Sequence, residues 1–457
     1  MNKNEEERDK KYHRMTEEPV EKLICKMSVQ TILAMLVTAI YSMADTFFVG
    51  KIDTASTAAV GVVFSAMSLI QALGFLYGHG SGNYISRMLG KKEEVLASEM
   101  AATGLAVGFA TGILLMILGL LFLRPLTIFL GATEGIVTET QSYLRIILYG
   151  APFMIGALTL NNQYRLQGNA GLGTLGIMTG AIVNCILDPI LIFGFHMGLR
   201  GAGYATTIGQ IIGFLVLLYV SQRKGNIEIH SKNCKFSFRL LKEMHQGGMP
   251  NLCRQGIASI AMALLNRAAG IYGEEAIAAF TIVNRVAAIV GALMIGFGHG
   301  FQPVCGFNFG AEKYERVKKA FYFVVKVSTI YAFISAVLME AAAPFLIRIF
   351  RDDREVIQLG VKILRIQAVS FPVLAWVTMI GMFLQNTSQF KKATLLTSAR
   401  QGTVFLPLIL TLPIFFGMNG IIAVQPVADA ITFLISLPVG LKALKHLDII
   451  CLHHSAS

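Results

Sequence analysis

Twelve long blocks of mainly apolar residues limit what this chain can fold into. Two of them contain the runs ILLMILGLLFL (113–123) and VSTIYAFISAVL (327–338), which have no polar face at helical spacing. A helix of about 20 apolar residues crosses the roughly 30 Å of hydrocarbon in a bilayer. Charged residues make up only 14% of the chain, against about 25% in soluble domains. The chain is therefore expected to be an all-α polytopic membrane protein.

The blocks predict twelve transmembrane helices. They cover residues 24–48, 58–80, 96–123, 141–160, 174–196, 202–220, 249–270, 276–300, 318–342, 362–384, 393–416 and 420–441. With a cytoplasmic N-terminus, 24 Lys and Arg residues lie on the inner side, counting Lys318 and Lys319 at the start of the ninth span, and six lie outside. Because positively charged loops remain in the cytoplasm, both termini are expected there.

The same distribution explains the net charge of +12 without a nucleic-acid partner. The cysteines occur singly, without CxxC or CxxH spacing, at Cys25, Cys185, Cys234, Cys253, Cys305 and Cys451. Neither a disulfide framework nor a zinc site is expected. No HExxH, GxSxG or P-loop motif occurs, so the chain is not expected to be an enzyme.

The chain contains two copies of one unit. GHGSGNYISRMLG (78–90) aligns with GHGFQPVCGFNFG (298–310), and YLRI (143–146) aligns with ILRI (363–366), both at an offset of 220 residues. Six spans in each copy predict two six-helix bundles related by a pseudo-twofold axis along the membrane normal. Transporters of this architecture bind substrate between the halves and rock one half against the other.

The spans and the repeat predict the domain organisation. It consists of a cytoplasmic N-terminal tail (1–22), an N-terminal six-helix bundle (23–221), a cytoplasmic linker (222–246), a C-terminal six-helix bundle (247–445) and a cytoplasmic C-terminal tail (446–457). In the linker, FSFRLLKEMHQ alternates apolar and basic residues at helical spacing. This pattern predicts an amphipathic helix along the membrane surface. A solvated linker helix is the alternative.

Two acidic side chains lie inside the apolar blocks of the first half, Asp45 in span 1 and Asp188 in span 5. Ionisable residues within membrane spans are costly and usually functional. At helical spacing, Asp45 shares one face with Thr38, Tyr41 and Ser42. The alternative is that Asp45 marks the end of span 1 and that Asp188 merely precedes a kinking proline.

Polar groups from four spans are expected at one depth. Asn184 lies four residues before Asp188, and Gly176 and Gly180 precede both on that face, which predicts a closely packed neighbouring helix. Spans 4 and 6 begin on the outside, which places their polar residues level with the two aspartates. The sequence therefore predicts an outward-facing site of Asp45, Tyr143, Asn184, Asp188 and Thr206.

Such a site suits a coupling ion. Desolvation and like charge raise the proton affinity of a buried carboxylate pair. Asp45, Asn184 and Asp188 also offer oxygens to a sodium ion, whereas no other metal is expected. In the second copy, Leu406 replaces Asp188 and Gly402 replaces Asn184, so the acidic site belongs to the first bundle.

The second half has intramembrane charges of its own. Arg285 and Asp429 are expected near mid-depth, where a polar pair between them would reduce the cost of burying both charges. We expect this pair to be structural. A role in substrate binding or coupling is the alternative.

Three segments resemble the multidrug and toxic compound extrusion (MATE) family of transporters. They are YSMADTFFVGKIDTASTAAVG (41–61), NCILDPILIFG (184–194) and GHGFQPVCGFNFGAEKYERVKKA (298–320). With the two six-span halves, the resemblance extends over residues 20–445. The chain is most similar to the DinF-like branch, which includes the MepA-type multidrug efflux pumps.

The resemblance implies a secondary active antiporter that exports lipophilic organic cations in exchange for protons or sodium ions. The cation-coupling site of this branch corresponds, residue by residue, to Asp45, Tyr143, Asn184, Asp188 and Thr206. Another branch couples through acids in spans 7 and 10, where this chain has Arg254 and Gln255 in span 7 and no acid in span 10. Many DinF-like relatives carry a proline near the start of span 1. This chain has no proline in that span, so coupling through a proline bend is not expected.

The alternative function is a flippase for lipid-linked oligosaccharides or isoprenoid lipids, within the same superfamily. The duplicated bundles disfavour a channel or a receptor. The expected partners are small organic cations and the lipid bilayer, with no nucleic acid and no cofactor apart from the coupling ion. A monomer is expected in the plasma (inner) membrane of a prokaryote.

Overall fold

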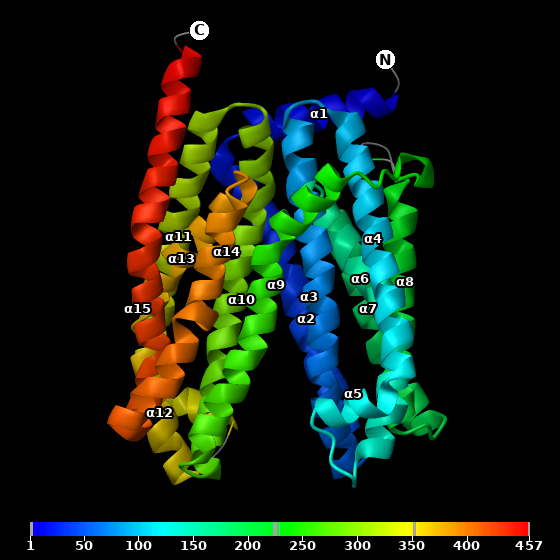
Figure 1. Ribbon diagram of the computed structural model, residues 1–457, viewed down its shortest axis with the longest axis vertical. Helices are drawn as coiled ribbons and strands as arrows, with labels where there is room; N and C mark the ends of the chain where they lie inside the picture. Colours follow the sequence, from blue (N-terminus) through cyan, green and yellow to red (C-terminus); the bar gives the residue numbers. More distant parts are fainter. Residues whose placement is uncertain (1–2, 223–225, 228, 351–352, 456–457) are drawn as a thin grey trace. The chain divides into compact units, whose positions relative to one another are not determined.

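The computed structural model describes residues 3–222, 226–227, 229–350 and 353–455, and every regular element within these ranges is a helix (Figure 1). The chain divides into two compact units. The first contains Met1–Glu18, Val29–Leu252 and Gly310–Glu312, and the second contains Pro19–Ser28, Cys253–Phe309 and Lys313–Ser457. One helix can contribute to both units, as α2 (Val20–Gly50) and α9 (Phe238–Gly270) do.

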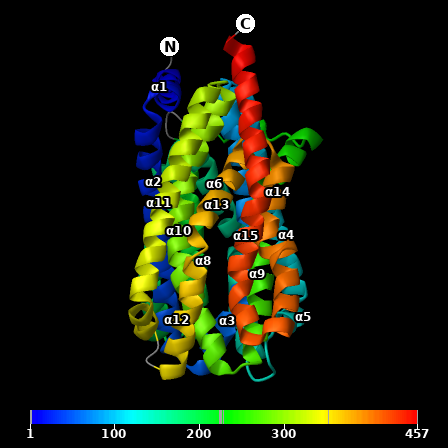
Figure 2. The ribbon, with the colours of Figure 1, turned by 90° about the vertical axis from the view of Figure 1, so that its left-hand side faces the viewer.

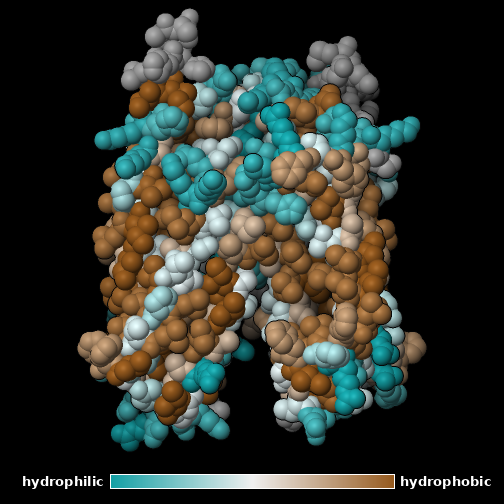
Figure 3. All heavy atoms as spheres, in the orientation of Figure 1, coloured by the Kyte–Doolittle hydropathy of each residue, from teal (hydrophilic) through white to brown (hydrophobic). Residues whose placement is uncertain are grey.

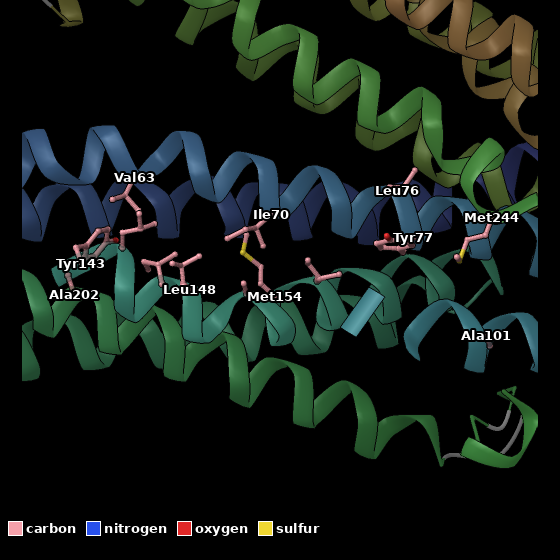
Figure 4. Close-up of a cluster of buried hydrophobic side chains, with 14 of the residues drawn as sticks. Val63, Ile70, Leu76, Tyr77, Ala101, Tyr143, Leu148, Met154, Ala202 and Met244 are labelled. Atoms are coloured by element: carbon pink, nitrogen blue, oxygen red, sulfur yellow. The ribbon is translucent and has the colours of Figure 1, made fainter. Parts of the chain in front are cut away.

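The first unit surrounds one central helix, α6, which packs against α3, α4, α7 and α8. In addition to its parts of α2 and α9, this unit contains α1 (Lys3–Glu17), α3 (Thr54–Gly90), α4 (Glu94–Leu121), α5 (Leu123–Phe129), α6 (Val137–Leu166), α7 (Ala170–Pro189), the π-helix η1 (Ile190–Gly194), α8 (Leu199–Ser221) and the short 3₁₀ helix η2 (Ser231–Asn233). Buried apolar side chains line α6 along its length, among them Tyr143, Leu148 and Met154 (Figure 4).

The second unit is also a helical bundle, in which α11, α13 and α15 pack against one another (Figure 2). Its elements are α10 (Glu274–Gly310), α11 (Tyr314–Phe350), α12 (Arg354–Ala368), α13 (Phe371–Asn386), α14 (Phe390–Ser398), the π-helix η3 (Ala399–Thr403) and α15 (Phe405–Ser455). The start of α2 belongs to this unit, where Ser28 Oγ donates to the Phe297 carbonyl at 3.0 Å. Without a proline, α2 is continuous from Val20 to Gly50.

Twelve membrane-crossing segments account for the helices, so the predicted fold class is confirmed. Among the described residues, nine helical stretches are long and apolar enough to cross a membrane. The pair α12 and α13 adds a tenth span, bent by 51°. The stretch Phe390–Cys451 counts as two spans because Gly417 is non-helical (φ 55°, ψ −134°). The twelfth is α9, which is more polar.

The repeat is visible in the helix boundaries. Helices α3 and α10 each have 37 residues and begin at Thr54 and Glu274, an offset of 220. Their connections to the next helix use positive φ at Lys92 (61°) and Glu312 (60°), again 220 residues apart. Gly198 (φ 53°, ψ −135°) has the backbone conformation of Gly417. The two copies therefore share these helices and turns, whereas the continuous helix α6 of the first copy corresponds to the bent pair α12 and α13 of the second.

Three segments predicted as tails or linker are helical. Residues 3–17 of the predicted N-terminal tail form α1, and α15 continues through residue 455 of the predicted C-terminal tail. The end of the linker, from Phe238, forms the first turns of α9 and continues unbroken into the seventh span. Residues 3–17, 238–246 and 446–455 contain no glycine or proline, the two residues that most disfavour the interior of a helix.

The surface of each unit is apolar along the helix sides and hydrophilic at the helix ends (Figure 3). Large apolar side chains such as Leu121, Phe333 and Ile414 are more than half exposed. Exposure of this extent suits contact with lipid and would be a liability in water. Within the core, by contrast, small residues permit close helix packing.

Candidate functional site

Close packing between α7 and α8 positions the first polar groups of the candidate site. A Cβ added to Gly180 would lie 2.7 Å from the Gly209 carbonyl oxygen, and one added to Gly213 would lie 2.8 Å from that of Gly176. Only residues without a side chain permit such an approach between membrane helices. The predicted close neighbour of Gly176 and Gly180 is therefore α8.

Asn184 and Thr206 meet across this contact. Asn184 Nδ2 donates to Thr206 Oγ1 at 3.1 Å, and each residue is 2% exposed. Asn184 Oδ1 is buried and has no hydrogen-bond partner within the described part of the chain. The amide is therefore oriented by the threonine and keeps a carbonyl oxygen available.

Asp188 lies at the end of α7, immediately before Pro189 and the π-helix η1. Its side chain is fully buried (0% exposed), and neither carboxylate oxygen has a hydrogen-bond partner among the described residues. A buried charge without a partner is unfavourable, so such a carboxylate takes up a proton or a cation. Wider helical turns of this kind are frequent at functional sites.

Asp45 approaches the same place from α2. Its Oδ1 is buried and, in the described residues, has no hydrogen-bond partner. Asp45 and Asp188 lie within electrostatic range of each other. Tyr143, on α6 and 1% exposed, interacts with both aspartates and with Thr206. The five predicted residues are therefore neighbours.

Two further side chains belong to this group of neighbours. Tyr41, one turn before Asp45 on α2, interacts with both aspartates and with Thr206. Cys185 interacts with Asp45 and Asp188. The polar face of span 1 already contained the signal for Tyr41, whereas no sequence signal distinguished Cys185 from the other single cysteines. Ser42, the other polar residue of that face, has its side chain outside the described residues.

The assembled group offers oxygen atoms almost exclusively. Two carboxylates, one amide carbonyl and the hydroxyls of a threonine and two tyrosines come from α2, α6, α7 and α8. Carboxylate and carbonyl oxygens are ligands of hard cations. A pair of carboxylates also shares protons readily, because one charge disfavours the other.

The second unit contains a different buried network around Asp429, on α15. Its carboxylate accepts hydrogen bonds from Arg400 Nε at 2.7 Å, Gln425 Nε2 at 2.9 Å and Ser370 Oγ at 2.9 Å. Asp429 is 2% exposed. Every bond involves one carboxylate and a donor from a neighbouring turn or helix, so this acid is fully satisfied.

The pair predicted between Asp429 and Arg285 is therefore not the one that forms. Arg285 is exposed on α10, whereas Arg400 lies on η3, which packs directly against α15. The sequence predicts a similar depth for Arg285 and Asp429, but depth alone does not decide which helix faces Asp429. The packing of η3 against α15 places Arg400 beside Asp429.

A protein-family model described as MatE matches residues 31–190 and matches again at residues 252–411. The two matches correspond to the two copies of the repeat. The multidrug export protein MepA of Staphylococcus haemolyticus (strain JCSC1435) is 25% identical over 426 residues, which cover 93% of this chain and 94% of MepA. MepA of Staphylococcus aureus (strain MSSA476) is 24% identical over 432 residues, or 94% and 95% of the two chains.

Solved structures share the fold. A MOP superfamily transporter from Pyrococcus furiosus superposes with a TM-score of 0.89 at 23% identity, over 95% of this chain and 98% of that one. A MATE structure in the bent conformation gives a TM-score of 0.90 at 23% identity, over 98% and 99% of the two chains. The duplicated family match and these folds lead to one conclusion. The chain belongs to the MatE family and is a membrane transporter, not an enzyme.

Proposed function

We propose that this chain is a secondary active multidrug exporter, which expels lipophilic organic cations in exchange for protons or sodium ions. Support for drug export comes from relatives named multidrug export protein that align over more than nine-tenths of the chain. The observation that carries ion coupling is Asp188, a fully buried carboxylate without a hydrogen-bond partner in the described residues. We propose that Asp45, Tyr143, Asn184, Asp188 and Thr206 form the coupling site.

In this mechanism, Asp188 and Asp45 alternate between two states. Without a proton or sodium ion, two carboxylates share an apolar interior, and a lipophilic cation elsewhere in the protein is held partly by their negative potential. When the ion binds, that potential is neutralised and the cation is released. Linkage requires the reciprocal effect, so a bound substrate weakens ion binding by the same factor.

The neutral members of the site orient the ion. Thr206 accepts from Asn184 Nδ2, which turns Asn184 Oδ1 away from the hydroxyl and leaves it without a protein donor among the described residues. The hydroxyls of Tyr41 and Tyr143 can donate to a carboxylate in the empty state or expose oxygen to a cation. We propose a monomer in the plasma membrane of a bacterium, with both termini in the cytoplasm.

The direct test is efflux of a fluorescent lipophilic cation from proteoliposomes under an imposed proton or sodium gradient. Wild type is compared with Asp188→Asn, which removes the charge and keeps the shape. We expect gradient-driven efflux to fall by at least about tenfold in the variant, in line with the loss of one essential ion contact. The gradient that drives wild-type efflux identifies the ion.

Asp53→Asn is the matched control. Asp53 caps α3 in the same unit by accepting from Ser56 N at 2.6 Å, and asparagine caps a helix equally well. Equal efflux by wild type and Asp188→Asn would refute coupling at this site. Absence of gradient-driven efflux in every sample would refute cation export and favour the lipid flippase.

A further inference from the structure

The linker between the two copies is fastened to the first unit before α9 begins. Asn233 Nδ2 donates to Ser98 Oγ at 2.7 Å. The amide of Lys235 donates to Thr103 Oγ1 at 3.1 Å, and the same hydroxyl donates to the Lys235 carbonyl at 3.2 Å. The Lys235 ammonium also pairs with Glu99, whose side chain is largely buried. These bonds hold the end of the linker against α4.

This attachment lies at the expected boundary of the hydrocarbon layer. Thr103 is nine residues after the start of α4, which is about 14 Å along the helix axis. A Cβ added to Gly104 would lie 2.8 Å from Ser81 Cβ, so α3 and α4 touch at this level. Ser81 follows the end of the second expected span (58–80), and Thr103 lies inside the third (96–123). The end of the linker is therefore at the depth where headgroups meet acyl chains.

Two phenylalanine side chains are exposed where the linker enters α9. Phe236 is 71% exposed and Phe238 is 81% exposed. The other face of this helix start is anchored, because Leu240 and Met244 are buried and a Cβ at Gly80 would lie 2.0 Å from the Met244 carbonyl oxygen. Helices that insert one face into the membrane interface carry phenylalanine on that face and basic residues beside it.

Basic side chains accompany the two rings. Arg239 and Lys242 are exposed and three residues apart, and within the described residues neither makes a hydrogen bond or an ion pair. Two acids of this region already have basic partners. Glu243 accepts from Arg87 at 3.2 Å, and Glu99 has the lysine described above. Arg239 and Lys242 therefore add positive charge that no described carboxylate pairs with.

The repeat shows that its fold does not require these residues. Gly248 on α9 and Ser28 on α2 are 220 residues apart, and the backbone of each packs against a glycine, on α3 and α10 respectively. The two helix starts are therefore equivalent. At the same offset, FSFR (236–239) corresponds to TEEP (16–19). One helix start thus has two aromatic rings and an arginine where the other has two acids and a proline.

We propose that this surface binds an anionic phospholipid of the cytoplasmic leaflet. Arg239 and Lys242 bind the phosphate of the headgroup, and the rings of Phe236 and Phe238 insert among the acyl chains. Each basic residue close to an anionic membrane surface raises the affinity about fivefold. A lipid is favoured over a protein partner because the rings lie at the level of the hydrocarbon boundary. The inference does not depend on which molecule is exported.

A single tryptophan can report binding at this surface. The chain has one tryptophan, Trp376 on α13, so Trp376→Phe combined with Phe238→Trp leaves one reporter at the start of α9. The full chain is placed in phosphatidylcholine nanodiscs that contain increasing fractions of brominated phosphatidylglycerol or brominated phosphatidylcholine. Bromine on the acyl chains quenches a tryptophan that touches them. We expect both lipids to quench, with a preference for phosphatidylglycerol of about 25-fold from two basic residues.

Arg239→Gln/Lys242→Gln in the reporter chain should remove the preference for phosphatidylglycerol and leave quenching by phosphatidylcholine. Each single variant should lose about fivefold. Lys391→Gln/Lys392→Gln is the matched control, because it removes two exposed lysines at the start of α14 and the same net charge. This control should retain the full preference. Thermal unfolding in the same nanodiscs verifies that every variant is folded.

Four results would overturn the inference. Absence of quenching by both lipids would place the ring in water, as in a solvated linker helix. Equal quenching by the two lipids would exclude a headgroup site. A preference that persists in Arg239→Gln/Lys242→Gln would exclude these two residues, and an equal loss in Lys391→Gln/Lys392→Gln would indicate attraction by net charge alone. Asp188→Asn should retain the lipid preference whether or not it abolishes ion-driven efflux.

Discussion

At the scale of single residues, the candidate coupling site combines one satisfied contact with several unsatisfied ones. The bond from Asn184 to Thr206 is complete, whereas Asp188 keeps two carboxylate oxygens without a partner in the described residues. A buried, unsatisfied polar atom costs about 1–3 kcal/mol. Proteins retain such atoms where a ligand satisfies them for part of a cycle, which is the basis of our first prediction.

Thr206→Val should impair the coupling site. Valine has nearly the shape of threonine but cannot accept from Asn184, so the amide loses its orientation. We expect a loss of about 1 kcal/mol of stability and a weaker dependence of efflux on the coupling ion. Thermal unfolding in detergent and efflux at graded ion concentrations measure the two effects.

Thr179→Val provides the comparison. Thr179 is partly buried on α7, and within the described residues its hydroxyl donates to the Leu175 carbonyl of its own helix at 2.8 Å. Its replacement should change stability by less than about 0.5 kcal/mol. If the two variants behaved alike, Thr206 would have no specific role.

At the scale of secondary-structure elements, the crossing of α7 and α8 sets the geometry of the site. Gly180 and Gly209 bring the two backbones together one turn before Asn184. The side chains of Asn184 and Thr206 reach each other only because the helix axes are this close. The glycines therefore set the distance between the two helices, and the contact between the polar side chains of the site depends on that distance.

Gly180→Ala should separate α7 from α8. The added Cβ would lie 2.7 Å from a backbone oxygen, which cannot rotate away. We expect a loss of about 1–3 kcal/mol of stability, together with weaker ion-dependent efflux. Thermal unfolding of the variant, followed by efflux assays at a permissive temperature, tests both consequences.

Gly61→Ala, on α3, is the corresponding control. A Cβ there meets no atom of the described chain within 4 Å. Alanine should be neutral or stabilising by up to about 1 kcal/mol, because it favours helix more than glycine does. A similar loss in both variants would mean that the effect of Gly180→Ala does not arise from the helix crossing.

The N-terminal helix α1 is held to other parts of the first unit by side-chain hydrogen bonds. Arg8 donates to Glu94 Oε2 at 2.6 Å and to the Asn226 carbonyl at 3.2 Å, and Arg14 donates to the Gly168 carbonyl at 3.0 Å. Lys11 lies between these arginines, with Nζ 3.0 Å from the side chain of Asn169. Burial, followed by the charges of Arg14 and Arg8, lowers the pKa of Lys11 to about 7.

This pKa predicts that α1 docks more firmly as the pH rises. Below pH 7, Lys11 is protonated in docked and free α1, and docking bears the full cost of burying the charge. Between pH 7 and about 10.5 the free helix holds one proton more than the docked helix, so docking strengthens across this window. Protection of Tyr12 from chymotrypsin should therefore increase from pH 7 to pH 9.

Lys11→Met removes the titrating amine. Cleavage of this variant therefore measures how the activity of chymotrypsin itself changes with pH. In this variant, protection of Tyr12 should not depend on pH beyond the change in the protease itself. A pH dependence as large as that of wild type would exclude Lys11 as its origin.

At the scale of the whole molecule, duplication fixes the number and direction of the spans. Six spans in each of the two copies make twelve crossings, and an even number of crossings predicts that both termini lie on one side. The surplus of Lys and Arg in alternate connections predicts that this side is the cytoplasm.

Reporter fusions test this orientation. Green fluorescent protein fused after residue 457 should fluoresce, because it folds in the cytoplasm. Alkaline phosphatase fused after Gly131, between α5 and α6, should be active outside, whereas a fusion after Gly168, between α6 and α7, should be inactive. Activity at Gly168 without activity at Gly131 would invert the topology.

The sequence by itself determined the membrane class, the twelve crossings, the duplication and the five residues that become neighbours at the candidate site. These features depend on hydrophobic length, charge bias and helical spacing, all of which are local along the chain. The amphipathic helix predicted in the linker corresponds to the start of α9, whereas the helix α1 lies in a segment that the sequence predicts only as a tail.

Only the tertiary structure decided which polar groups pair. Arg400 rather than Arg285 binds Asp429, and Tyr41 joins the two aspartates and Thr206. A pattern along one helix gives depth and face, but the partner depends on which helices pack together and how closely. That choice depends on contacts between helices from distant parts of the chain, such as the glycine contacts of α7 with α8, so it is decided only when each bundle assembles.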